Sequence, residues 1–132
     1  MWHRARFIPL LASACVLIAV VLGAARPALA GPCQDAVQGK IAWDYNGNTT
    51  WAPANVARLC GDATSDQPAR CFDRVMHGGI EWGGGRRWEW SNAIDLCKGT
   101  PDANATIRCF QQFIAQGRSW PESINFASRG GC

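Results

Sequence analysis

Six cysteines at recurring intervals constrain this sequence more than any other feature. The chain reads LCGDATSDQPARCF over residues 59–72 and LCKGTPDANATIRCF over 96–110. Leucine-cysteine, a glycine-bearing polar loop and arginine-cysteine-phenylalanine therefore occur twice. Aligning the chain on cysteine gives three units, 33–60, 71–97 and 109–132. Similarity at this period indicates repeated supersecondary units stacked in one domain, so we expect a single repeat domain over 31–132.

The pattern inside each unit favours helices. CFDRVM and CFQQFI place cysteine and phenylalanine three or four positions before further apolar residues, the spacing of one helical face. Asn104 is placed as an N-cap, and Gly61 and Gly99 as C-terminal caps. We expect an all-α, small disulfide-rich protein of three repeated helical hairpins. Short strands are the alternative, which RRWEW over 86–90 permits.

The pairing of the cysteines depends on the fold, because six cysteines allow fifteen connectivities. In an antiparallel hairpin, the start of the first helix lies beside the end of the second. This geometry favours Cys33–Cys60, Cys71–Cys97 and Cys109–Cys132, each contributing about 3 kcal/mol in the chain-entropy model. The alternative joins neighbouring units through Cys60–Cys71 and Cys97–Cys109, which leaves Cys33 and Cys132 for each other.

The first 30 residues have the composition of a secretory signal peptide. Arg4 and Arg6 precede an apolar run over 7–23, and the segment ends in Ala28-Leu29-Ala30. A basic start, an apolar middle and small residues at the end predict cleavage after Ala30. An uncleaved membrane anchor is the alternative, since the apolar run is close to a short span. We expect a secreted or periplasmic protein.

Cleavage changes the charge and the cysteine count. The chain has 13 basic and 10 acidic residues, and three of the arginines lie in 1–30, which leaves 10 of each sign. The mature segment therefore has no basic footprint for nucleic acid and no charge run for a membrane surface. Removing Cys15 leaves an even six cysteines, typical of three disulfides in an oxidising compartment. With His77 as the one mature histidine and no C-x-x-C pair, we expect no metal and no cofactor.

Tryptophan is the most unusual component of the mature segment. Trp43, Trp82 and Trp120 recur at equivalent places after the first cysteine of each unit, which favours a role in packing. Tryptophans beside polar groups on loops also suit stacking against sugars or partner side chains. Turns of stacked hairpins lie along one edge, so we expect one binding surface there. Its candidate residues are Trp43, Tyr45, Trp82, Arg86, Arg87, Trp88 and Trp90.

Two loops partly resemble ion-binding sites. Three glycines and two arginines over 83–87 could grip a phosphate or carboxylate, although a flexible insertion is the simpler interpretation. The loop at 44–50 begins like a calcium loop, but its glycine stands at the fourth position rather than the sixth, so a turn is favoured.

The sequence favours a non-catalytic binding module over an enzyme. Its ligand is a glycan, cell-wall material or a protein. A small structural or inhibitory protein that acts on a partner is the first alternative. The second is a hydrolase in which Glu81 or Glu89 acts with His77, because paired carboxylates can cleave a glycosidic bond.

Overall fold

The computed structural model describes residues 31–132 and is all-α, as expected. The proposed signal peptide, with Cys15, lies outside the described residues. Nothing in 31–132 forms a strand, so the β-rich alternative is wrong for this part of the chain. The six helices of these residues are α1 (Pro32–Val37), α2 (Pro53–Cys60), α3 (Gln67–His77), α4 (Trp90–Cys97), α5 (Ala103–Ala115) and α6 (Trp120–Ala127).

The disulfides follow the pairing expected from antiparallel helices. Cys33–Cys60 joins the start of α1 to the end of α2, and Cys71–Cys97 joins α3 to the end of α4. Cys109–Cys132 joins the middle of α5 to the last residue of the chain, beyond α6. The predicted pairing within each unit is confirmed.

Most of the helices of residues 31–132 have a proline at their start or are capped by an aspartate. α1, α2, α3 and α6 each carry a proline in the first two positions, where the missing N–H costs no hydrogen bond. The N-cap predicted for α5 is wrong. Asp102, rather than Asn104, caps this helix by accepting a hydrogen bond from the Ala105 N–H at 2.9 Å. Asn104 is the second residue of α5 and therefore lies inside its first turn.

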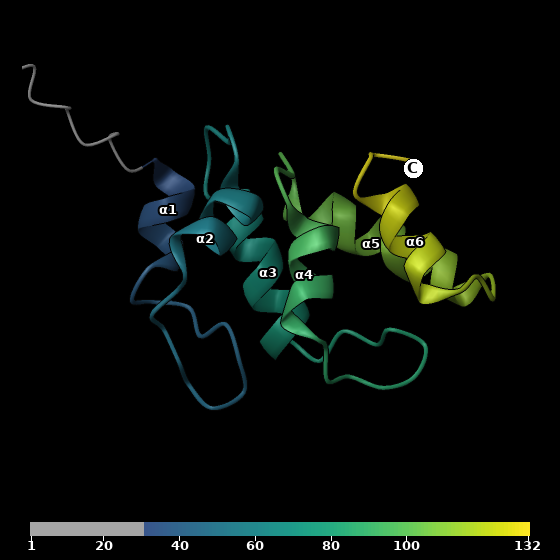
Figure 1. Ribbon diagram of the computed structural model, residues 1–132. Coiled ribbons are helices and arrows are strands. Elements are labelled where there is room, and N and C mark those ends of the chain that lie inside the picture. Colours follow the sequence, from purple (N-terminus) through teal and green to yellow (C-terminus); the bar gives the residue numbers. More distant parts are fainter. Residues whose placement is uncertain (1–30) are drawn as a thin grey trace, which may run out of the picture.

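The helices form a row in which each contacts only its near neighbours (Figure 1). α1 packs on α2 and α3, and α6 packs on α4 and α5; within the described residues, neither α1 nor α2 reaches α5 or α6. The long loops 38–52 and 78–89 lie on one side of the row, the lower side in Figure 1. The short connections 61–66 and 98–102 lie on the opposite side.

Two buried tryptophans from the long loops each pack on a phenylalanine of a later helix in the row. The Trp51 ring lies 4.7 Å from the Phe72 ring of α3, and the Trp88 ring lies 5.0 Å from the Phe110 ring of α5. Each indole N–H donates a 2.8 Å hydrogen bond to a carbonyl of its own loop, that of Ile41 for Trp51 and that of Ile80 for Trp88. The polar atom of each buried ring is thus satisfied, as burial of tryptophan requires.

Across residues 31–132, the helices are too short or too polar for any of them to span a membrane.

Candidate functional site

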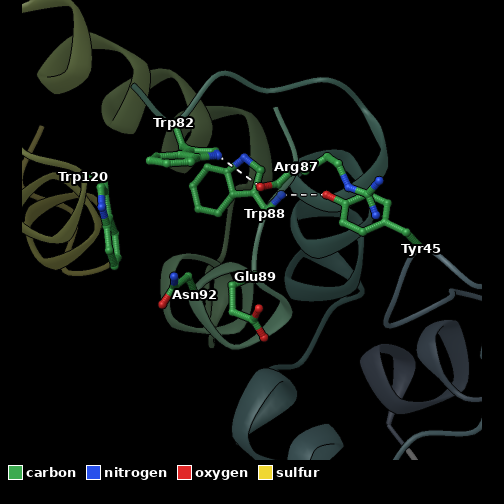
Figure 2. Close-up of a pocket in the computed structure, with 7 residues that line it drawn as sticks. All are labelled: Tyr45, Trp82, Arg87, Trp88, Glu89, Asn92 and Trp120. Atoms are coloured by element: carbon green, nitrogen blue, oxygen red, sulfur yellow. Dashed lines mark hydrogen bonds between the residues drawn. The ribbon is translucent and has the colours of Figure 1, made fainter. Parts of the chain in front are cut away.

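A pocket of about 450 Å³ opens on the long-loop side of the molecule. We call it the loop-edge pocket. Loop 38–52 contributes one lining residue, loop 78–89 contributes four, and α4 and α6 contribute one each. These residues are Tyr45, Trp82, Arg87, Trp88, Glu89, Asn92 and Trp120 (Figure 2). Residues 75 positions apart in the sequence therefore meet at one site, of a volume typical of small-ligand pockets.

Trp88 is held rigidly at the inner side of this pocket. Only 5% of its surface is exposed. Its indole N–H is taken by Ile80, and its backbone N–H donates to the Tyr45 hydroxyl at 2.7 Å. The second bond ties loop 38–52 to loop 78–89, as the dashed line in Figure 2 shows. Tyr45 therefore fixes the relative position of the two loops.

Trp82 and Trp120 form a corner of two nearly perpendicular aromatic planes. Their ring centroids lie 6.4 Å apart with 81° between the planes. Trp82 is half-buried and donates its indole N–H to the Arg87 carbonyl at 3.1 Å, whereas Trp120 is exposed over 37% of its surface. In Figure 2 both rings are seen edge-on and the Trp88 ring is seen nearly face-on. Three aromatic rings of differing orientation thus border the same space.

Loop 78–89 closes tightly around the Trp82 ring. A Cβ atom at Gly84 would lie 2.2 Å from this ring, so only glycine fits there. The Glu81 carboxylate accepts hydrogen bonds from the N–H groups of Gly83 (3.2 Å) and Gly85 (2.7 Å). Two of the three glycine N–H groups that the sequence offered to an external anion are therefore occupied by an internal one.

The charged residues that line the loop-edge pocket are Arg87, which is drawn beside Tyr45 in Figure 2, and Glu89, which is drawn beside Asn92. The Arg87 guanidinium stacks over the Tyr45 ring at 4.5 Å. Within residues 31–132 the salt bridges involve other basic residues, and none includes Arg87. Glu89 is the N-cap residue of α4, but its side chain makes no capping hydrogen bond. A cation and a carboxylate thus remain exposed and available to a ligand.

Four of the seven candidate binding residues line this pocket: Tyr45, Trp82, Arg87 and Trp88. Trp43 and Trp90 pack against each other at 6.0 Å and are partly buried, and Arg86 lies 3.8 Å from Glu81. Sequence reasoning did not include Trp120 or Asn92 in the binding surface. The recurrence of Trp120 at the place of Trp43 and Trp82 predicts a packing role for it. Nothing in the sequence distinguishes Asn92 from the other polar residues of α4.

The three candidate hydrolytic residues have different neighbours, and the His77 ring packs on Tyr45 at 5.8 Å. Glu89 borders the loop-edge pocket. Glu81 is engaged by Gly83, Gly85 and Arg86, while His77 contacts the Ala42 carbonyl at 2.8 Å and lines a separate hollow. Residues 31–132 also contain no group of three or more His, Cys, Asp or Glu side chains placed to hold a metal ion.

Comparison of the chain with protein-family models, with curated proteins and with solved structures found no match.

Proposed function

We propose that this chain is an exported, non-catalytic binding module and that its ligand enters the loop-edge pocket. The observation that carries the proposal is the convergence of Tyr45, Trp82, Trp88 and Trp120 on one pocket that also holds exposed Arg87 and Glu89. Concave sites with aromatic walls and a few polar groups are the usual form of ligand sites. The ligand is a small group, free or carried on a glycan or a protein.

The scaffold supports this proposal through rigidity. We infer three repeated hairpins over 33–60, 71–97 and 109–132, stacked so that their turns share one edge. Stacked repeats commonly present ligand surfaces along one side. Three disulfides fit an oxidising compartment, which agrees with the signal peptide expected over 1–30.

The test is tryptophan fluorescence of oxidised residues 31–132, titrated with glycans, cell-wall fragments and small organic ions. Because Trp120 is exposed, we expect acrylamide to quench part of the emission and a ligand to protect it. Trp120→Ala should remove that protected fraction, whereas Phe126→Ala, an exposed aromatic that does not line the pocket, should leave it. Binding that is unchanged in Trp120→Ala would place the ligand elsewhere and overturn the proposal.

A protein partner is the second candidate, and an exposed aromatic cluster favours it. Phe126 is exposed over 42% of its surface, and Arg118 lies over the rings of Phe113 and Phe126 at 5.2 and 5.4 Å. Aromatic and arginine side chains are enriched at protein interfaces. A module that acts through this cluster should lose its partner in Phe126→Ala and keep it in Trp120→Ala, the reverse of the first outcome.

A further inference from the structure

The aromatic corner of the loop-edge pocket narrows the class of ligand. We propose that the pocket binds a methylated ammonium group, as in a phosphocholine or betaine zwitterion. This inference rests on the proposed function, since it concerns the same pocket. It comes from three features: the orientation of the rings, the state of the indole N–H groups, and the placement of the two free charges.

The first feature is the orientation of the rings. Trp82 and Trp120 stand at 81° to each other, and Trp88 borders the same space with its ring turned differently from both (Figure 2). A sugar ring stacks best on a single open aromatic face. A compact group with methyls on several sides instead contacts walls that meet at an angle. Aromatic cages of this kind recognise quaternary ammonium groups through the negative face of each ring.

The second feature is that the indole N–H groups of two of the three tryptophans are already used. Trp82 donates to the Arg87 carbonyl and Trp88 donates to the Ile80 carbonyl. Trp82 therefore offers a ligand only its π face and apolar edge, and the 5% of the Trp88 surface that is exposed carries no free donor. A quaternary ammonium needs no hydrogen-bond partner, so these walls satisfy it fully. A primary ammonium would find no acceptor on the aromatic walls and would have to direct its N–H groups to Glu89 or to water.

The third feature is the arrangement of charge. The Glu89 carboxylate lies at the pocket without a capping bond, so it can balance a ligand cation in the aromatic corner. The Arg87 guanidinium, drawn on the Tyr45 side in Figure 2, has no acidic partner within 31–132. It can take a carboxylate or phosphate. A ligand with a methylated cation at one end and an anion at the other matches both poles.

The experiment is calorimetric titration of oxidised residues 31–132 with matched pairs: phosphocholine against phosphoethanolamine, and glycine betaine against glycine. Each pair differs only in the three methyl groups. We expect the methylated member to bind at least about tenfold more tightly, since a desolvated cation–π contact is worth about one such factor. Trp120→Ala and Glu89→Gln should each weaken phosphocholine by about tenfold, while Phe126→Ala and Glu122→Gln should not. Binding to vesicles of phosphatidylcholine then shows whether the protein also binds this headgroup on a lipid surface.

The outcomes separate this inference from the proposed function. Equal binding of the two members of each pair overturns the methylated-ammonium assignment. So does a glycan that binds in their place and is lost in Trp120→Ala, although that result keeps the pocket as the binding site. Failure of every probe to protect tryptophan emission overturns both. Circular dichroism and a count of free thiols show that each variant is folded and oxidised.

Discussion

At the scale of single residues, position relative to the second helix of a unit decides which tryptophan is buried. Trp51 and Trp88 each stand two residues before such a helix, and each packs on the phenylalanine that follows the next unit's first cysteine. Alignment on the first cysteine of each unit instead predicts that Trp43, Trp82 and Trp120 are the packing residues. Trp43 and Trp82 do pack against the core, but Trp120 is exposed. Loop length differs between units, so distance from the cysteine does not fix the environment.

The contact between Trp88 and Phe110 gives the first prediction. Trp88→Ala should lower the free energy of unfolding by about 3–5 kcal/mol, because it removes a buried ring that packs on Phe110. Trp88→Phe should cost about 1–3 kcal/mol, since the Ile80 carbonyl loses its donor. Guanidinium unfolding of the oxidised protein measures both. Trp120→Ala is the comparison variant and should cost less than Trp88→Ala, because 37% of the Trp120 surface is exposed. A larger loss for Trp120 than for Trp88 would contradict the burial described above.

Gly84 gives a second prediction at this scale. In Gly84→Ala, the new methyl group would meet the Trp82 ring at 2.2 Å, so the loop must move away from the ring. Overpacking of this kind costs about 1–3 kcal/mol. Because the strain falls on the pocket wall, we expect ligand affinity and the Trp82 environment to change more than global stability. Ligand titration alongside thermal unfolding checks this, and unchanged affinity would be the contrary result.

At the scale of elements, each long loop is organised by one carboxylate near its aromatic residues. The Asp44 carboxylate accepts from the N–H groups of Asn46 and Asn48, two and four residues later. Glu81 accepts from those of Gly83 and Gly85 with the same spacing. The sequence favoured a turn at 44–50, and these hydrogen bonds confirm it. The two hydrogen bonds to Glu81 show that loop 78–89 has internal contacts, and the flexible insertion favoured from its glycines stays a prediction.

The Asp44 turn predicts a pH dependence. Partial burial works to raise the pKa of Asp44, but hydrogen bonds from Asn48 and then from Asn46 outweigh it and hold the pKa below its ordinary value of 3.8. A carboxyl group with a lowered pKa in the folded state stabilises that state above 3.8, and this contribution is lost as the pH falls through the lower, folded pKa. Amide chemical shifts of Asn46 and Asn48 should therefore titrate with a midpoint below 3.8. Asp44→Asn should abolish that titration, and a midpoint above 3.8 would contradict the hydrogen-bond pattern.

At the scale of the whole molecule, the two ends of the row of helices differ from its middle in the residues at corresponding positions. The position that holds Phe72 and Phe110 is occupied by Gln34 in the first unit, and the position that holds Trp51 and Trp88 is occupied by Arg118 in the third. The first and third units thus carry a polar side chain at a position where the other units have an aromatic side chain in a Trp–Phe contact.

The disulfides should differ in accessibility along this row. Cys33, Cys60, Cys71 and Cys97 are fully buried, whereas Cys132 is exposed at the chain end. Because thiol–disulfide exchange needs access to a sulfur atom, we expect Cys109–Cys132 to be reduced first. Mild reduction followed by alkylation and mass spectrometry should label Cys109 and Cys132 alone. Labelling of Cys33 and Cys60 at the same dose would show that α1 and α2 open more easily than the C-terminal tail.

The sequence by itself determined the helical class of residues 31–132, because helical spacing is a short-range regularity. It also favoured the disulfide pairing within units, but it left the pairing between neighbouring units open, and the structure decided between the two. The edge that gathers the aromatic residues was also expected, since turns of stacked hairpins share a side. Tertiary structure alone decided the membership of the loop-edge pocket. Trp120 reaches Trp82 only because α6 packs on α4 and α5. Tyr45 meets Trp88 only because loop 38–52 and loop 78–89 come together in space. Such contacts depend on the distance between elements, which no local pattern encodes.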